Sequence, residues 1–503
     1  MTEPTFADRD AVARTDAHGV ALDCLAAGIA AALPERIVAD RASVADGVLG
    51  VESVDGTHVE YDLDDYDEVR LVGAGKAAGG MANALATRLG DRLVGGAVVT
   101  VDEGDESDEG DGGDESDEGD GGDESDEGHE ASPVDVLPGD HPLPSDRGVA
   151  STRRVIDVAD GAGPNDLMIA VVTGGGSALL AAPADPISID DFRTATAELL
   201  ASGASIDEIN AVRKHCSAVK GGRFAGVAAP ATVLTLAVSD VVGDDPGVIA
   251  SGPTAPDPST YADALAVCDR YGLDLPATVR EHLRAGVAGD RPETPTAADP
   301  LFERTRTLVV GNARTALDAA ATAAADRGYD PLVLAAGVRG EAREAALSHV
   351  AIAEECTETG SPATPPCVLL SGGETTVTLG TADGRDGRDG ELNGHDERDE
   401  RHGEPADGRH GGPNGEFATS AGVALDRDGV VVASVDTDGI DGTSGAAGGI
   451  VDAATLDADA ARDALARHDV APLLDAADAL LRTGPTGTNV NDLRVLVVTG
   501  PAE

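Results

Sequence analysis

The chain has 503 residues, of which 92 are acidic and 36 are basic, and its formal net charge is −56 at pH 7. That length predicts two or three domains. The charge excludes a general nucleic-acid-binding protein and disfavours docking on anionic membranes, because both of these surfaces attract basic proteins. Aromatic residues make up only 2% of the chain, so we expect a core of Ala, Val, Leu and Ile.

The acidic composition indicates adaptation to salt. Only three of the 36 basic residues are lysines, whereas arginine and aspartate are plentiful. Mutual repulsion of this size is tolerated where molar salt shortens the Debye length to about 3 Å or less. The composition is therefore typical of proteins from halophilic archaea that accumulate salt.

No export or membrane segment is expected. The N-terminal stretch MTEPTFADRDAVART lacks the apolar segment of a signal peptide, and no apolar run approaches the ~18 residues that a membrane span needs. The five cysteines lie far apart and form no CxxC pair, which argues against a zinc site or a disulfide framework. We expect a cytoplasmic protein without a membrane partner.

Two polar segments interrupt the chain. Residues 102–130 are almost wholly Asp, Glu, Gly and Ser and repeat the motif GDESDEGDG. With no apolar residue to bury, this segment is predicted to be a disordered insertion. Residues 381–411 form a second polar insertion.

The rest of the chain alternates short apolar runs with Ala-rich stretches that follow glycine-rich turns. Strands are predicted at 67–72, 167–173, 232–240, 306–311 and 330–336, with a strand pair around a glycine turn at 367–379. This order predicts an α/β fold with a mostly parallel sheet, whose ligands bind at the carboxyl ends of the strands. A segment rich in Pro, Gly and acidic residues, 285–302, separates an expected N-terminal unit of residues 1–290 from a C-terminal unit of residues 303–503.

The turn Gly73-Ala74-Gly75-Lys76 joins the first predicted strand to an Ala-rich helix. Backbone N–H groups, a helix N-terminus and an ammonium would meet there, which suits an anion such as phosphate. The pattern is neither a Walker A loop nor a G-x-G-x-x-G fingerprint. Because lysine is so scarce here, Lys76 is the first candidate for a catalytic cation, a compact point charge that the planar guanidinium of arginine does not replace.

A second turn of the same kind runs from Gly174 through Gly175 and Gly176 to Ser177. It predicts another anion site between a strand and a helix. Ser177 is alternatively a hydrolase nucleophile, but the turn is not G-x-S-x-G and no matching Ser-His-Asp spacing appears. We therefore favour phosphate binding over nucleophilic catalysis for Ser177.

The other two lysines share the segment INAVRKHCSAVKGGRFA, residues 209–225, which is predicted to be a helix that ends at Gly221-Gly222. Five cationic or titratable residues lie within it: Arg213, Lys214, His215, Lys220 and Arg223. They would bind a carboxylate or phosphates, or instead complement the helix dipole and pair with acidic neighbours. The sequence leaves these two interpretations equally open.

Carboxylates gather after two other predicted strands. Asp240, Asp244 and Asp245 follow the strand at 232–240, and Asp436, Asp438 and Asp441 lie in the stretch SVDTDGIDGTSG. Carboxylates at strand ends bind Mg²⁺ or accept a hydroxyl proton, although aspartate is also common in turns. The second group resembles a calcium loop without its final Glu, so a metal shared with a phosphate is the better interpretation.

Seven blocks together resemble the glycerate 2-kinase family, whose N-terminal part is known as DUF4147 and whose C-terminal part is known as MOFRL. In order, they are GAGKAAGGMA, VTGGGSALL, INAVRKHCSAVKGGRFA, SDVVGDDPGVIASGPT, SGGETTVTL, DTDGIDGTSGAAGG and TGPTGTNVNDL. The resemblance covers nearly everything except the two polar insertions. It implies a larger Rossmann-like N-terminal domain and a smaller C-terminal α/β domain, with the active site in the cleft between them.

The resemblance also implies a reaction, in which ATP and Mg²⁺ serve to phosphorylate D-glycerate at its 2-hydroxyl to give 2-phosphoglycerate. Whether the protein is a homodimer or a monomer is left open. Lys76, Asp240, Arg213 and Lys214 are then the candidate catalytic residues. The candidate nucleotide-binding residues are Gly73, Gly75, Gly174, Gly175, Gly176, Ser177, Ser371, Gly372, Gly373, Glu374, Thr375 and Asn414. The candidate metal ligands are Asp240, Asp245, Asp436 and Asp438.

One position departs from the family pattern, and two other functions compete. The family's Gly-Gly-Arg-Asn segment reads Gly411-Gly412-Pro413-Asn414 here. Either another cation, Arg409, Arg213 or Lys214, replaces that arginine, or the arginine is dispensable. A hydroxypyruvate reductase that uses NAD(P)H is the nearest alternative, although no convincing dinucleotide fingerprint is present. A non-catalytic solute-binding protein is a weaker alternative.

Overall fold

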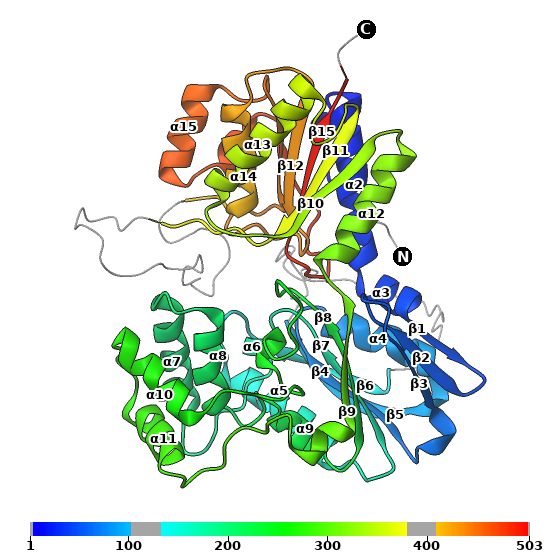
Figure 1. Ribbon diagram of the computed structural model, residues 1–503, viewed down its shortest axis with the longest axis vertical. Helices are drawn as coiled ribbons and strands as arrows, with labels where there is room; N and C mark the ends of the chain where they lie inside the picture. Colours follow the sequence, from blue (N-terminus) through cyan, green and yellow to red (C-terminus); the bar gives the residue numbers. More distant parts are fainter. Residues whose placement is uncertain (1–3, 102–131, 380–408, 501–503) are drawn as a thin grey trace, which may run out of the picture.

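The computed structural model describes residues 4–101, 132–379 and 409–500. The insertion predicted at 102–130 lies outside the described residues, and so does the insertion predicted at 381–411, except for its last three residues. Figure 1 shows two layered α/β units, one above the other. This arrangement confirms the predicted fold class.

The first unit is built on a six-stranded, wholly parallel sheet in the order β6-β5-β4-β7-β8-β9. Every residue of its central strand β7 is buried, as expected for a parallel strand that helices cover on both faces. The strands are β4 Val69–Ala74, β5 Leu93–Val101, β6 Val134–Gly139, β7 Leu167–Val172, β8 Thr232–Val238 and β9 Thr305–Gly311. A small antiparallel sheet precedes them: β1 Ala42–Ala45, β2 Val48–Glu52 and β3 His58–Asp62.

Helices surround this sheet and form a lobe at one side of it (Figure 1). They are α3 Pro34–Arg41, α4 Ala78–Leu89, α5 Asp146–Asp160, α6 Gly176–Leu179, α7 Ile189–Ala201, α8 Ile206–His215, α9 Arg223–Ala228, α10 Tyr261–Tyr271 and α11 Ala277–Val287. The 3₁₀ turns are η1 Leu63–Asp65, η2 Gly90–Arg92, η3 Ile249–Ser251 and η4 Pro300–Glu303.

The second unit has a mixed sheet in the order β10-β11-β15-β12-β13-β14, in which only β10 and β11 are parallel neighbours. The strands are β10 Asp330–Val338, β11 Cys367–Gly373, β12 Val430–Asp436, β13 Gly448–Asp452, β14 Leu480–Leu481 and β15 Asp492–Val498. The helices are α12 Ala313–Asp326, α13 Ala342–Thr359, α14 Pro413–Ala424, α15 Ala458–Arg467 and α16 Ala471–Ala476.

The N-terminus belongs to this second unit. After the short helix α1 (Arg9–Val12), helix α2 (Asp16–Ala32) packs on α12, β12 and β15. In Figure 1 the blue α2 lies beside the yellow and red strands. The chain then passes to the first unit at Leu33 and returns at Asn312, so one residue between elements carries each passage.

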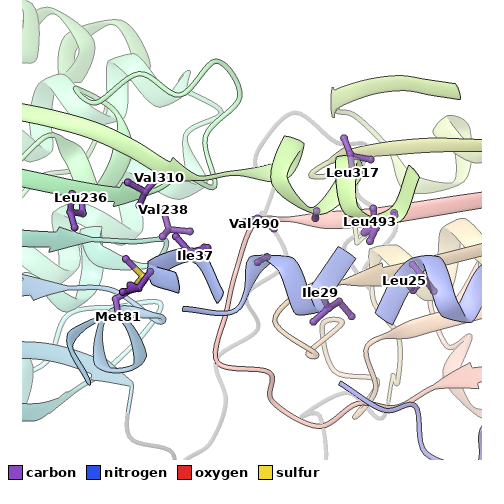
Figure 2. Close-up of a cluster of buried hydrophobic side chains, with 14 of the residues drawn as sticks. Leu25, Ile29, Ile37, Met81, Leu236, Val238, Val310, Leu317, Val490 and Leu493 are labelled. Atoms are coloured by element: carbon purple, nitrogen blue, oxygen red, sulfur yellow. The ribbon is translucent and has the colours of Figure 1, made fainter. Parts of the chain in front are cut away.

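Strand β9 completes the first sheet, although it lies beyond the expected boundary at residue 303. The division of the chain into domains at 290–303 stays a prediction, but the two sheets themselves separate at Asn312, after β9. Apolar side chains continue across that junction: Figure 2 shows Ile29 of α2, Val238 of β8 and Leu493 of β15 in one buried cluster.

Two predicted elements are wrong in detail. The expected strand pair at 367–379 is the single strand β11, because Gly373 does not turn but stays paired between Val338 of β10 and Asp492 of β15. Its φ is 120°, and an added Cβ would lie 2.3 Å from the Val338 nitrogen. The expected helix at 209–225 is two helices. Ser217 accepts from the backbone N–H groups of Val219 and Lys220, which ends α8 at His215 before a new helix begins at Arg223.

Within the described ranges, no single helix is long and apolar enough to cross a membrane. One pair of helices, Asp16–Ala32 and Pro34–Arg41, has the length and composition together, and its members meet at 67°.

Candidate active site

The two sheets meet at the side chain of Lys76. Its Nζ atom lies 2.9 Å from Oδ2 of Asp438, which follows β12 in the second unit. The lysine side chain is 25% exposed and the aspartate side chain 10% exposed, so the pair remains open to a ligand. Residues that are 362 positions apart in the chain are thus brought together at the carboxyl ends of β4 and β12.

The glycines before Lys76 serve strand packing. An added Cβ would lie 2.0 Å from the Val171 carbonyl oxygen at Gly73 and 2.0 Å from Thr173 Oγ1 at Gly75, so β4 and β7 pass too closely for any side chain. The N–H groups of the turn are also engaged: Gly75 donates to the Val99 carbonyl and Lys76 donates to the Gly174 carbonyl. The proposed phosphate contact at this turn therefore falls to the Lys76 side chain alone.

The second turn lies against Lys76 and Asp240. An added Cβ at Gly174 would come within 2.6 Å of Asp240 Oδ2, and one at Gly175 within 3.0 Å of Lys76 Cγ. Asn491, at the other unit's edge, donates its side-chain amide to the Asp240 carbonyl oxygen over 2.6 Å. The junction thus joins three strand ends of the first sheet to the loop before β15.

Carboxylates crowd this centre. Burial by itself lowers the pKa of Lys76, but the charges of Asp438, Asp436 and Asp240 raise it above its usual value, so the ammonium stays protonated. Burial raises the pKa of Asp240. Burial, together with Asp438 and Asp492, raises the pKa of Asp436 well above its usual value. One ammonium therefore faces more negative charge than it neutralises, which favours a further cation.

Glu374 directly follows β11, and solvent reaches its side chain. The surrounding protein atoms nevertheless displace much of the water around its carboxylate. This desolvation, and then the charges of Asp492 and Asp240, raise the pKa of Glu374 to about 7. It differs from the other candidates on its loop, which are buried. Ser371 bonds to Nε2 of His349 over 2.8 Å, and the Thr375 N–H donates to Asp492 over 3.1 Å. Only Glu374 of this group presents its side chain to a ligand.

Asn414 joins three segments of the second unit by hydrogen bonds. Its Nδ2 donates to Asp492 over 2.7 Å, its backbone N–H donates to Asp441 over 2.8 Å, and its Oδ1 accepts from Ser434. Both ends of the amide are engaged and the residue is only 1% exposed. Asn414 would therefore act in nucleotide binding by holding Asp441 and Asp492 in place rather than by contacting the nucleotide. Burial raises the pKa of Asp441 to about 7 even though it caps α14.

Arg494 was missed by sequence reasoning. It is fully buried, donates to Thr375 Oγ1 over 2.9 Å and pairs with Asp492, and its guanidinium lies 5.0 Å from the centre of the Phe417 ring. It supplies the positive charge beneath Asp492 and Asp436. Within an apparently ordinary β-strand, RVLVV, an arginine at a core position is the one indication that the sequence offers.

The basic segment divides into paired and unpaired charges. Lys214 lies 3.2 Å from Asp257, and both are buried, so its charge is neutralised within the protein. Arg213 is half-buried, and no hydrogen bond or ion pair joins it to another described residue. Of the two candidates, Arg213 is therefore the one placed to receive an anion.

The candidate metal ligands divide as well. Asp436 and Asp438 share the junction with Asp240, whereas Asp245 accepts from the backbone N–H of Gly247 in its own turn. No group of three or more His, Cys, Asp or Glu in the described residues has the arrangement of a metal site. The junction supplies the oxygen ligands that Mg²⁺ prefers, but Lys76 Nζ lies among them.

Two family models match the chain. One, described as "Domain of unknown function (DUF4147)", matches residues 20–284, and the other, described as "MOFRL family", matches residues 401–492. The first match spans the five leading strands of the parallel sheet, and the second spans the loop of Asp436 and Asp438. Of the Lys76–Asp438 pair, the lysine thus lies in the first match and the aspartate in the second.

Relatives match over most of their lengths. The chain is 36% identical to D-glycerate 2-kinase of Thermotoga maritima over 436 residues, 85% of this chain and 90% of that protein. It is 35% identical to glycerate 2-kinase of Pyrococcus horikoshii over 380 residues, 74% of this chain and 79% of that protein. It is 39% identical to an Agrobacterium vitis protein named "Putative hydroxypyruvate reductase" over 434 residues, 85% and 86% of the two chains.

Two crystal structures have the same fold. The glycerate kinase of T. maritima superposes with a TM-score of 0.72 at 32% identity, covering 96% of this chain and 99% of that one. A protein of P. horikoshii superposes with the same TM-score and identity, covering 96% and 98%.

Proposed function

The chain belongs to the DUF4147–MOFRL family of glycerate kinases, and from that premise we propose that it transfers the γ-phosphoryl group of ATP to the 2-hydroxyl of D-glycerate, giving 2-phosphoglycerate and ADP. The observation that carries the proposal is the Lys76–Asp438 pair at the junction of the two sheets. Phosphoryl transfer depends mainly on positioning and charge neutralisation, which a cation among ordered carboxylates supplies.

Lys76 stabilises the transferring phosphoryl group. Its ammonium is held by Asp438 and is protonated at neutral pH. When the γ-phosphate enters the junction, Nζ donates to its equatorial oxygens and balances the charge that is shared between the entering and leaving oxygens. Asp438 then remains as the group that orients the lysine.

Asp240 accepts the proton of the attacking hydroxyl. It lies beside the Gly174 turn and Lys76, and burial raises its pKa toward that of a useful general base. As the 2-oxygen of glycerate forms its bond to the γ-phosphorus, the bond from that phosphorus to the bridging oxygen of ADP breaks, and the hydroxyl proton passes to Asp240.

The proposed reaction implies Mg²⁺, and the junction offers it carboxylate oxygens, although three or more acidic side chains of the described residues are not arranged there as a complete metal site. Asp436 and Asp438 would hold it with the oxygens of the nucleotide phosphates, since their crowding favours a further cation. Bound there, the ion would neutralise phosphate charge and orient the triphosphate. Arg213 would bind the carboxylate of glycerate; Lys214 instead stabilises Asp257.

The competing activity is reduction of hydroxypyruvate, the activity in the name of the A. vitis relative. The turns that would cradle a dinucleotide have engaged N–H groups at Gly75 and Lys76, whereas the crowded carboxylates suit a metal-bound triphosphate. The kinase is therefore the better proposal.

The deciding experiment supplies ATP, Mg²⁺ and D-glycerate in molar KCl and resolves 2-phosphoglycerate from 3-phosphoglycerate. We expect stoichiometric ADP and 2-phosphoglycerate. A parallel assay follows NADH at 340 nm with hydroxypyruvate, where we expect no oxidation. Oxidation of NADH without ADP formation would refute the proposal.

A further inference from the structure

A chain of hydrogen bonds leads from the junction to helix α8. Ser177 Oγ lies 2.9 Å from Ser251 Oγ, and Ser251 donates to Oδ1 of Asn210 over 2.9 Å. Ser251 is fully buried and Asn210 is 2% exposed. Because Ser177 ends the glycine turn that lies against Asp240 and Lys76, the chain links the proposed reacting centre to α8.

The direction of each hydrogen bond follows from the amide oxygen. Oδ1 of Asn210 carries no proton, so Ser251 must donate its single proton there. Ser251 then accepts from Ser177, which uses the only hydroxyl proton of Ser177. The oxygen of Ser177 is left with lone pairs: it can accept a hydrogen bond from a ligand hydroxyl, but it cannot donate one to a phosphate oxygen.

The other end of the Asn210 amide is unpaired. Its Nδ2 atom is buried and has no hydrogen-bond partner among the described residues. In this orientation the amide oxygen faces Ser251 and the NH₂ group points away from it. Buried donors without a partner are unfavourable and uncommon, and a bound ligand is one way in which a protein satisfies them.

Two basic side chains without an acidic partner among the described residues lie on helix α8 and close to it. Arg213 lies three residues after Asn210, on the same face of α8, and pairs with no acidic group in the described chain. Lys220 is fully buried and donates only to the Leu180 carbonyl over 3.1 Å. Burial, and then the nearby charge of Arg213, lower the pKa of Lys220 to about 7.

In a chain with a net charge of −56, two neighbouring basic side chains without an acidic partner are unexpected. Lys214, on the same helix, shows the usual solution, because buried Asp257 neutralises it. Arg213 is therefore available to an anionic ligand, because no acidic group of the described residues pairs with it.

We propose that Arg213, Asn210 and Ser177 form a subsite that selects a hydroxycarboxylate as the phosphoryl acceptor. Arg213 and the Asn210 amide bind the carboxylate, and Ser177 accepts from a hydroxyl of the same molecule. Ser251 is a positioning residue, since its hydroxyl bonds to the side chains of Ser177 and Asn210 rather than to the ligand. The inference rests on the proposed kinase function and reassigns Ser177 from the nucleotide to the acceptor substrate.

Steady-state kinetics of Ser177→Ala and Asn210→Asp test the subsite. Each change removes a group that contacts D-glycerate, and the second also places a negative charge against its carboxylate. We expect the KM for D-glycerate to rise about tenfold or more while the KM for ATP stays within about twofold. Ser251→Ala should shift the same KM, because the amide loses its orientation.

The matched control is Asn165→Asp, which makes the same exchange on an exposed residue that contacts Asp67 before β7. We expect it to leave both KM values unchanged. An unchanged KM for D-glycerate in Asn210→Asp would overturn the proposal. So would a raised KM for ATP in Ser177→Ala with that for D-glycerate unaltered, because the serine would then serve the nucleotide.

A second measurement uses only the wild-type protein, in case the buried variants do not fold. With saturating ADP, D-glycerate should raise the unfolding temperature, and the uncharged D-glyceramide at equal concentration should not. Equal shifts, or no shift with D-glycerate, would overturn the carboxylate assignment. Failure of the kinase proposal is distinguishable, because the wild-type protein would then form no ADP from ATP and D-glycerate.

Discussion

At the scale of single residues, scarcity and environment together set Lys76 apart. The chain has three lysines in three different environments. Lys214 pairs with Asp257, Lys220 is buried and donates to the Leu180 carbonyl, and Lys76 pairs with Asp438 where ligands can reach it. A lysine in such a carboxylate cluster is a mobile point charge. Arginine, with its planar fork, would need more space and would fix a different geometry.

Replacing the Lys76 ammonium by a guanidinium, in Lys76→Arg, should impair catalysis. We expect kcat to fall by about 10²- to 10³-fold, because one preorganised donor to the transferring phosphoryl group is misplaced. Thermal unfolding should change little, since the side chain still pairs with Asp438. Arg88→Lys, an opposite exchange on the outer side of α4, is the control and should retain full activity. Near-wild-type kcat in Lys76→Arg would remove the role given to that ammonium.

At the scale of elements, helix α2 is the piece of the N-terminus that completes the second unit. It packs on α12 and on β15, the strand that carries Asp492 and Arg494. Gly28 is a point of close approach: an added Cβ would lie 2.4 Å from Leu493 Cδ2 and 3.0 Å from the Ala316 carbonyl oxygen. The position of α2 thus bears on the strand beneath the site.

Two glycines of α2 should respond oppositely to the same substitution. Gly28→Ala forces α2 away from α12 and β15, and we expect a loss of about 1–3 kcal/mol in the free energy of unfolding. Gly19→Ala meets only Arg327, at 3.9 Å, and should gain up to about 1 kcal/mol from helix propensity. Equilibrium denaturation in molar KCl measures both; equal effects would show that Gly28 is not a packing contact.

The start of α2 also predicts a pH dependence. His18 is fully buried between Thr15 and Arg14, and burial followed by the charge of Arg14 lowers its pKa from 6.5 to about 4. The folded state keeps the ring neutral while the unfolded chain takes up a proton below pH 6.5. The buried neutral ring of His18 therefore contributes fully to the free energy of unfolding above about pH 6.5, and this contribution is lost as the pH falls toward 4.

Thermal unfolding between pH 7 and pH 4 measures the effect. The glutamine of His18→Gln cannot be protonated. Between pH 7 and pH 4 the free energy of unfolding of this variant should therefore fall by up to about 3 kcal/mol less than that of the wild-type protein. His58→Gln, on the exposed strand β3, should leave the slope as it is in the wild-type protein. If both variants keep the wild-type slope, acid sensitivity does not arise at the α2 anchor.

At the scale of the whole molecule, charge decides the conditions for folding. A net charge of −56 repels itself at every distance that solvent does not screen. The two units meet in a buried apolar cluster and in polar contacts near the site, such as Asn312 to Asp244 at 2.6 Å and Asn491 to the Asp240 carbonyl oxygen. Screening should therefore matter both for each unit and for their junction.

We expect the unfolding temperature to rise by about 10 °C or more between 0.2 M and 3 M KCl, because the Debye length falls from about 7 Å to about 2 Å. Sucrose at matched water activity is the control, since it stabilises compact states without screening charge. Activity should follow the same salt dependence. An unfolding temperature that is equal in both salt concentrations would refute the electrostatic account.

The fold class was predictable because its cues are local. Apolar runs, glycine turns and Ala-rich helices follow one another in the order that a parallel sheet requires, and the structure confirms the strands around Lys76 and Asp240. The errors were also local: Gly372-Gly373 looked like a turn but remained in β11, and Gly221-Gly222 looked like a helix end but preceded α9. Glycine permits several conformations, and only its neighbours select one.

The sequence by itself determined which chemical groups the protein has and, through the seven ordered blocks, which family it belongs to. Only the tertiary structure decided which groups meet: Lys76 with Asp438, Asn210 with Ser251, and Arg213 with no acidic partner in the described chain. Such pairings depend on how two sheets dock through Leu33 and Asn312. Hydrophobic periodicity acts over a few residues, whereas an ion pair 362 positions apart exists only once both cores have formed.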